Sequence, residues 1–213
     1  MAINDIFQAV LAFDQAAVIE KVNAEIAAGS DIQAILNEGL ISAMDEVGKK
    51  FSDGDLFVPE MLMAAQAMKA GLEVVKPHLA DGATESRGTI VIGTVKGDLH
   101  DIGKNLVAMM MEGGGFEVVD LGVDVDAEKF VEAAKAHNAG VIGLSALLTT
   151  TMPAMEATIK AVKEAGLAVK TMVGGAPVTE DFAASIGADG YSADAPGAVE
   201  MARKLIADQK MAA

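Results

Sequence analysis

The stretch VIGTVKGDLHDIGKNLV, residues Val91–Val107, contains the point at which an apolar run stops and a histidine follows. The run from Val91 to Val95 is mostly β-branched, which is typical of a strand buried on both faces. The segment Asp98–Asp101 then interrupts it with two acids around His100, before helical spacing begins. The chain has three histidines in all, so one at a strand–helix junction needs a functional explanation.

Short apolar runs and helical patterns alternate around this stretch. Five runs are expected to be strands: Gly88–Val95, Glu117–Val123, Gly140–Leu147, Ala168–Val173 and a short one near Tyr191. Five helical patterns follow them: Asp101–Met111, Ala127–Ala136, Thr151–Glu164, Glu180–Ile186 and Gly197–Gln209. Five β/α units predict an α/β fold with a five-stranded parallel sheet, flavodoxin- or Rossmann-like, in strand order 2-1-3-4-5.

The first 80 residues are expected to be helical throughout. Four amphipathic patterns with short connections predict an N-terminal four-helix bundle: Ile3–Phe13, Gln15–Ala28, Ile32–Lys50 and Glu60–Val75. The segment Asp81–Arg87 has no large apolar residue. We therefore expect a helical cap domain at 1–80, a linker at 81–87 and an α/β domain at 88–213.

Composition restricts the class of protein. The net charge of −15 argues against nucleic-acid or anionic-membrane partners. The absence of cysteine excludes disulfides and thiolate metal sites. Neither a signal peptide nor a membrane span is indicated, so we expect a soluble, cytoplasmic protein.

The predicted topology brings three polar or glycine-bearing strand ends to one edge of the sheet, where open parallel sheets bind ligands. A carboxylate at Asp98 can hold one ring nitrogen of His100 and leave the other as a ligand or base. Ser145, at the end of the third strand, could buffer the charge of Asp98. The pair Gly174-Gly175 would let a flat group approach the backbone. Singly, His100 and Asp98 could be ordinary helix-start residues, but the three ends together favour a functional site.

The ordered set Asp98-x-His100-x-x-Gly103, Ser145-x-Leu147 and Gly174-Gly175 resembles the three-part signature of cobalamin-binding domains. The gaps of 41 and 26 residues are similar to those of the methionine synthase branch. Upstream, Val47–Leu79 resembles two helices of the bundle that caps such domains. A bundle followed by a corrinoid domain resembles the corrinoid proteins of anaerobic methyltransferase systems, which serve methanol, methylamines, glycine betaine or aromatic methyl ethers.

This resemblance implies a cofactor and a role for each matching residue. The cofactor would be cobalamin or a related corrinoid, in methylcobalamin, Co(I) and Co(II) states. His100 would be the lower ligand of cobalt, with Asp98 and Ser145 as a relay behind it. The other implied cofactor contacts in the α/β domain are Leu99, Asp101, Ile102, Gly103, Leu147, Thr149, Thr150, Gly174, Gly175 and Ala176. From the bundle, Phe57, Met61 and Leu62 would shield the upper face, unless they are simply bundle core. Asp101 also suits the positive end of the following helix.

The function implied is that of a methyl carrier without turnover of its own. Its partners would be a substrate:corrinoid methyltransferase, a second methyltransferase acting on tetrahydrofolate or a thiol, and a reductive activase. Two alternatives share the signature, namely the small subunit of an adenosylcobalamin mutase and a cobalamin-based sensor. A response regulator is disfavoured because the third strand ends in SALLTT, without the acceptor aspartate.

Overall fold

A computed structural model describes residues 2–78 and 87–212 of the chain. The chain forms two compact units, Met1–Glu85 with Glu112–Gly115, and Ser86–Met111 with Phe116–Ala213. The expected linker, residues 81–87, lies outside the described residues except for Arg87.

The first unit is helical. Its elements are α1 (Ala2–Leu11), α2 (Gln15–Ala27), α3 (Ile32–Ala34), the π-helix η1 (Ile35–Ile41), α4 (Ser42–Ser52), α5 (Val58–Val75) and the 3₁₀-helix η2 (Lys76–His78). Local chemistry sets two of the helix starts. The Asp14 carboxylate accepts the Ala17 N–H at the start of α2. Pro59 occupies the first turn of α5, where its missing N–H costs nothing.

The third expected helix, Ile32–Lys50, is continuous but not uniform. Its middle, η1, has π geometry between two α-helical segments. In a π turn, residues four and five apart share a face, and Ile35, Gly39 and Leu40 are all buried. Apolar spacing indicates that a helix forms but does not distinguish a local widening of its turns.

The bundle packs closely where its helices carry glycine. A Cβ added at Gly71 of α5 would lie 2.7 Å from Val18 of α2 and 2.8 Å from Leu40. The absence of a side chain there lets these helices approach each other and bury Val18 and Leu40 completely.

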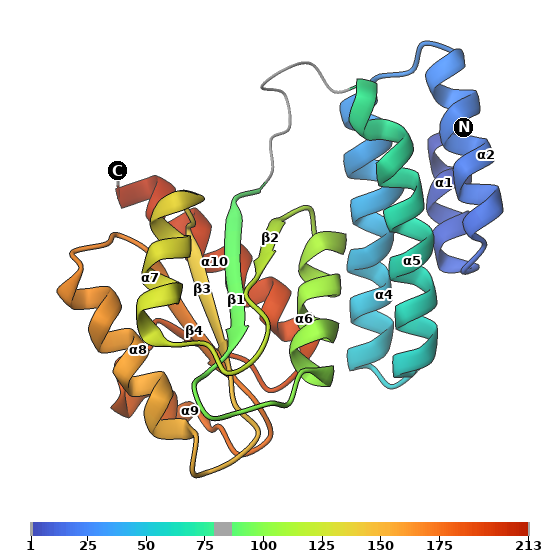
Figure 1. Ribbon diagram of the computed structural model, residues 1–213. Helices are drawn as coiled ribbons and strands as arrows, with labels where there is room; N and C mark the ends of the chain where they lie inside the picture. The colour runs from blue at the N-terminus through green and yellow to red at the C-terminus, as the bar shows by residue number, and fades with distance from the viewer. Residues whose placement is uncertain (1, 79–86, 213) are drawn as a thin grey trace. The chain divides into compact units, whose positions relative to one another are not determined.

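The second unit is an α/β domain. Its strands are β1 (Thr89–Thr94), β2 (Glu117–Asp120), β3 (Val141–Ser145), β4 (Lys170–Gly174) and β5 (Gly190–Tyr191). All pairs are parallel and the order is β2-β1-β3-β4-β5, which confirms the predicted fold class and strand order. The helices are α6 (Ile102–Gly113), α7 (Ala127–Ala136), α8 (Met152–Glu164), α9 (Glu180–Ser185) and α10 (Ala195–Ala212). Helices α7 and α8 cover one face of the sheet, and α6 and α10 cover the other (Figure 1).

The hydrophobic core on the α7–α8 face is formed by side chains of these helices and of the strands that they cover. Phe130 of α7 is fully buried there, with Ile142 of β3 and Met155 of α8. A Cβ at Gly93 would lie 2.7 Å from the Phe130 ring, so a glycine in β1 makes room for this aromatic side chain.

The carboxyl ends of the central strands are aligned. Thr94 at the end of β1 pairs with Ser145 of β3, which pairs with Gly174 of β4. β2 ends at Asp120, three residues before the expected limit, because the chain turns at Gly122 with φ +81°. The loops after β1, β3 and β4 therefore leave the sheet next to one another, at the edge where the site was expected.

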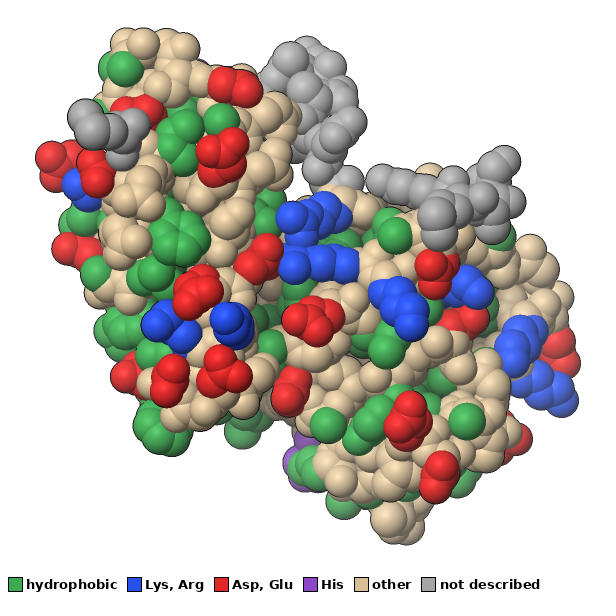
Figure 2. All heavy atoms as spheres, turned by 180° about the vertical axis from the view of Figure 1, so that it is seen from behind, with side chains coloured by type: hydrophobic (Ala, Val, Ile, Leu, Met, Phe, Trp, Pro, Cys, Tyr) green, Lys and Arg blue, Asp and Glu red, His purple; other side chains and the backbone are tan. Residues whose placement is uncertain are grey.

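Acidic side chains are spread over both units on the face that Figure 2 shows, among apolar, uncharged and basic ones. Across the described residues, no helix combines the length and the apolar character that a membrane crossing requires.

Candidate functional site

Asp98, in the loop after β1, is the centre of a hydrogen-bond network. Its side chain is fully buried. Oδ1 accepts the His100 N–H at 3.0 Å and His100 Nδ1 lies 2.8 Å away. Oδ2 accepts the Leu147 N–H and the Thr151 hydroxyl, both at 2.8 Å. The carboxylate thus joins the loops after β1 and β3.

These contacts decide the protonation state of Asp98. Burial alone would raise the pKa of its carboxyl group. The hydrogen bonds from Leu147 and His100 N–H groups, and then from the Thr151 hydroxyl and the His100 ring, outweigh burial and hold that pKa well below its usual range. Asp98 is therefore a carboxylate at neutral pH and can only accept hydrogen bonds.

The ionised carboxylate determines the tautomer of the neutral His100 ring. Because Asp98 only accepts, the proton of the ring lies on Nδ1, and Nε2 keeps its lone pair. The His100 side chain is 51% exposed. The buried Thr94 hydroxyl also donates to the His100 carbonyl at 2.8 Å. The ring is thus fixed by its backbone and by Nδ1, with a nitrogen lone pair free for a ligand.

The hydroxyl group that donates a hydrogen bond to Asp98 belongs to a different residue from the one expected. Ser145 was predicted to buffer this charge, but the donor is Thr151, six residues further along the chain. Ser145 is the last residue of β3, and its carbonyl accepts the Val95 N–H at 3.0 Å. Its hydroxyl has no hydrogen bond to Asp98 in the described part of the chain. Strand pairing holds Ser145 in register, and the turn before α8 brings Thr151 to the carboxylate instead.

Thr94 and Thr151 are the side chains at this site to which the sequence analysis gave no role. The threonine run at 149–151 was a visible signal for Thr151, although spacing alone could not tell which of its hydroxyls turns inward. Thr94 has no comparable signal, because a threonine inside an apolar strand is common.

Four exposed apolar side chains lie close to His100 along the chain or in the loop after β3. They are Leu99, Ile102, Leu147 and Leu148, exposed by 71, 85, 42 and 42%. Single exposed apolar residues are ordinary on protein surfaces, but several on adjoining loops mark a binding surface. An apolar ligand of some size fits these loops better than a small polar one.

The glycines of the motif have two different structural roles. A Cβ at Gly103, in the first turn of α6, would meet nothing within 4 Å, so the protein itself does not require a glycine there. A Cβ at Gly175 would lie 1.8 Å from the Ala146 carbonyl oxygen, and its φ is +135°. Gly175 is therefore required by the packing of the loop after β4 on the end of β3, whereas Gly103 leaves room for a ligand.

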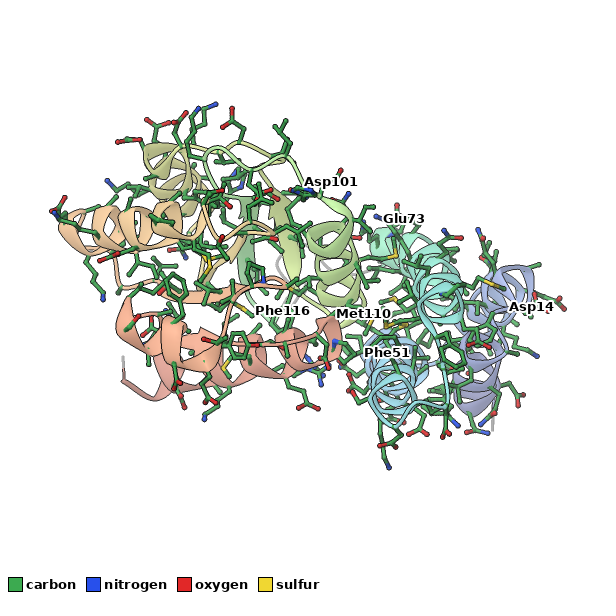
Figure 3. The ribbon with its side chains drawn as sticks, turned by 90° about the horizontal axis from the view of Figure 1, so that it is seen from below. Asp14, Phe51, Glu73, Asp101, Met110 and Phe116 are labelled. Carbon is green, nitrogen blue, oxygen red and sulfur yellow. The ribbon has the colours of Figure 1, made fainter. Side chains whose placement is uncertain are left out.

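The remaining expected contacts fall on both units. Asp101, labelled in Figure 3, lies where the chain enters α6 and accepts from the Asn105 side chain at 3.1 Å. Thr149, Thr150 and Ala176 are exposed in the loops after β3 and β4. In the helical unit, Phe57 is 70% exposed and Leu62 is partly buried, while Met61 is completely buried in the bundle core.

Two family models match the chain. One is a B12 binding domain over residues 88–200, and the other is also a B12 binding domain, over residues 2–76. The first contains the whole Asp98–His100 network. The chain belongs to the B12-binding corrinoid proteins.

Relatives of this corrinoid protein resemble it over nearly their whole length. Dimethylamine corrinoid protein 1 of Methanosarcina acetivorans is 48% identical over 90% of this chain and 89% of its own. Trimethylamine corrinoid protein 1 of the same organism is 46% identical over 93% of this chain and 94% of its own. The methanol:cobalamin methyltransferase complex MtaBC of Methanosarcina barkeri contains a chain that is 32% identical, with a TM-score of 0.87, covering 97% of this chain and 80% of that one.

The residues of this corrinoid protein fit the cobalamin or related corrinoid that the family models imply. In the part of the chain that the structure describes, no three His, Asp or Glu side chains are grouped as a metal-ligand set. A corrin ring brings its own four equatorial nitrogens, so a single protein ligand suffices. His100 offers one lone pair beside exposed apolar side chains and the open space at Gly103.

The two glycine roles predict opposite results on substitution. Gly103→Val is expected to leave the apoprotein within about 1 kcal/mol of wild-type stability and to weaken corrinoid binding by at least about tenfold. Gly175→Ala is expected to cost the apoprotein about 2–3 kcal/mol or more, because both φ and the Ala146 carbonyl oppose a side chain. Urea unfolding of the apoproteins and spectral titration with hydroxocobalamin measure the two effects. Wild-type corrinoid affinity in Gly103→Val would contradict the inference that the ligand occupies the space beside Gly103.

The hydrogen bond from the Thr151 hydroxyl to Asp98 can be tested in the apoprotein. Thr151→Val removes a donor from Oδ2, so the pKa of Asp98 is expected to rise and the free energy of unfolding to fall by about 1–2 kcal/mol at pH 7. Carboxyl ¹³C NMR titration and urea unfolding report these changes. Ser145→Ala is the matched control, expected to leave the pKa of Asp98 unchanged. A shift in Ser145→Ala with none in Thr151→Val would restore the original assignment.

Proposed function

We propose that this protein is a corrinoid-carrying methyl-transfer subunit in which His100 provides the lower axial ligand of cobalt. It would shuttle a methyl group between a substrate:corrinoid methyltransferase and a second methyltransferase that acts on tetrahydrofolate or a thiol. The observation that carries the proposal is the free Nε2 of His100, left available because Nδ1 is held by the buried Asp98 carboxylate.

The corrinoid, when bound, supplies the cobalt atom that carries the methyl group. The chain supplies the environment of that atom. Asp98 keeps the proton on Nδ1, which leaves the lone pair of Nε2 available to a metal. Leu147 N–H and Thr151 hold the carboxylate in place, so that the ring cannot turn away without breaking hydrogen bonds.

The same network holds the ring without a bound metal. The His100 N–H and Nδ1 lie 3.0 and 2.8 Å from Oδ1 of Asp98. The ring is therefore already oriented, with Nδ1 on the carboxylate, before a corrinoid binds.

The relatives support a choice of first partners to test. The curated relatives quoted above carry dimethylamine and trimethylamine in their names, at 46–48% identity. The MtaBC neighbour is part of a complex with a methanol methyltransferase. Methylamine:corrinoid methyltransferases are thus the first candidates for the donor side, and a methanol methyltransferase is the second. We propose a reductive activase as a further partner.

Reconstitution tests the proposal directly. The apoprotein is mixed with hydroxocobalamin, and the absorption spectrum and the EPR spectrum of the reduced Co(II) form are recorded. We expect one corrinoid bound per chain and, in ¹⁵N-labelled protein, a single ¹⁵N coupling from histidine in the EPR spectrum, which distinguishes it from the ¹⁴N of the cofactor's own base. The carrier is then reduced further to Co(I), the state with the electron pair that a methyl cation equivalent needs, and is offered to methylamine methyltransferases with their methyl donors. Binding without a protein nitrogen coupling would reject His100 as ligand, and failure to accept a methyl group from any donor enzyme would reject the carrier role.

A further inference from the structure

Asp124, in the loop after β2, has an uncommon backbone conformation. Its φ is +53°, one of three positive values found at non-glycine residues in the described part of the chain. Such a conformation costs about 1 kcal/mol for an ordinary residue, and aspartate is among the types that tolerate it best. Strain of this kind persists where surrounding contacts require it.

The contacts of Asp124 all reach the loop that carries the histidine. Its own N–H donates to the Asp98 carbonyl at 2.9 Å. Its Oδ1 accepts the Gly97 N–H at 2.8 Å. One residue of the β2 loop therefore holds the Gly97–Asp98 segment at both ends, and the positive φ directs its N–H and its carboxylate to that segment together.

The Gly97 contact also explains the electrostatics of Asp124. The Gly97 N–H has the largest effect and lowers the pKa of this carboxyl group; burial opposes it, and Lys96 lowers the pKa further. Lys96 lies 3.4 Å from Asp124 and 3.3 Å from Asp126. Since these charges are about half exposed, the ion pairs add little to stability. The backbone contact is therefore the significant one.

The histidine loop is thus held from two sides. The β3 loop fixes the carboxylate of Asp98 through Leu147 and Thr151. The β2 loop fixes its backbone through Asp124. His100 follows two residues later and takes its position from Asp98 through two hydrogen bonds.

We propose that Asp124 is a positioning residue for His100, acting through Gly97 and Asp98 to hold the imidazole where it can ligate cobalt. This inference rests on the proposed function. Asp124 does not touch the ring. Its effect is to hold the backbone of Gly97 and Asp98, from which the His100 ring takes its position.

Three substitutions separate the acceptor from the backbone conformation and from the charge. Asp124→Asn keeps an acceptor oxygen and tolerates positive φ, and it loses the charge. Asp124→Gly keeps the conformation and the N–H, and it loses the acceptor for Gly97. Lys96→Met removes the exposed ion pairs alone and is the control. Asp124→Ala, which also lacks an acceptor, takes the place of the glycine variant if that one does not fold.

Two readouts follow the ring, one without cofactor and one with it. In the apoprotein, ¹H–¹⁵N NMR detects the Nδ1–H proton of His100 through its protection by Asp98. In the protein loaded with hydroxocobalamin and reduced to Co(II), EPR gives the ratio of histidine-ligated to unligated cobalt. Melting temperatures are measured alongside. A purely structural role would lower the melting temperature without changing ligation in the folded fraction.

We expect Asp124→Gly to lower the ligated-to-unligated ratio about tenfold and to weaken the Nδ1–H signal, with Asp124→Asn within about threefold of wild type and Lys96→Met unchanged. An unchanged ratio and signal in Asp124→Gly would overturn this inference while leaving the proposed function intact. Absence of histidine ligation in the wild-type protein would overturn the proposed function and this inference with it.

Discussion

The variant His100→Ala is expected to bind corrinoid without any protein nitrogen on cobalt. The His100 ring is the group that presents a free lone pair among the exposed apolar residues of the β1 and β3 loops. Its removal leaves no protein ligand at that position. In EPR of the Co(II) form of ¹⁵N-labelled protein, the ¹⁵N coupling should vanish, which distinguishes the protein ligand from the ¹⁴N of the cofactor's own benzimidazole base. Methyl transfer from a donor enzyme should slow by at least about 100-fold, since the lost group is a direct ligand and not a partner of one.

The apoprotein should tolerate this change. The ring is half exposed, and Asp98 keeps the Leu147 N–H and Thr151 as donors after the ring is lost. We expect a loss of about 1–2 kcal/mol in the free energy of unfolding, from one buried carboxylate hydrogen bond. His137→Ala, at the exposed end of α7, is the matched control. A ¹⁵N coupling that persists in labelled His100→Ala would show that another residue ligates cobalt.

The fold was predictable because its signals are local and repeated. Apolar runs such as Val141–Ser145 alternate with helical patterns, and parallel strands with short connections allow few topologies. The sheet edge that carries the site follows from that topology. The sequence alone therefore predicts that Asp98, His100 and the end of β3 lie near one another. In the structure, Asp98 and His100 are in direct contact.

The sequence could not predict the contacts that depend on where a single hydroxyl, carbonyl or N–H group points. Ser145 and Thr151 both follow from the same stretch, and only the turn before α8 decides which hydroxyl meets Asp98. Gly175 reads like a ligand-binding glycine, yet the Ala146 carbonyl occupies the space beside it. Asp124 gave no signal at all, because its role depends on a positive φ that nothing in the neighbouring sequence indicates.

The variant Asp98→Asn tests the network behind the ligand most severely. Each oxygen of Asp98 accepts two hydrogen bonds. In asparagine one of these oxygens becomes an NH₂ group, which is itself a donor and cannot accept from the two donors that face it. If the NH₂ faces His100, Nδ1 must become an acceptor and the proton moves to Nε2, which removes the lone pair from the ligand position. If it faces Leu147, that N–H is left buried without an acceptor. In both cases the negative charge that raises the basicity of the ring is lost.

We therefore expect Asp98→Asn to bind corrinoid but to ligate cobalt about 10–100-fold more weakly than wild type, and to lose about 1–3 kcal/mol of stability at pH 7. The low pKa of Asp98 gives this loss a pH dependence. Its contribution is complete above the unfolded value of about 4 and disappears as the pH falls toward the lower folded value. Urea unfolding at pH 7 and pH 3 should show the difference between wild type and variant shrinking in acid. Asp208→Asn, in α10, makes the same charge change in an exposed side chain outside the site and should leave ligation unaltered. Equal ligation in Asp98→Asn and wild type would mean that the carboxylate does not set the state of the ring.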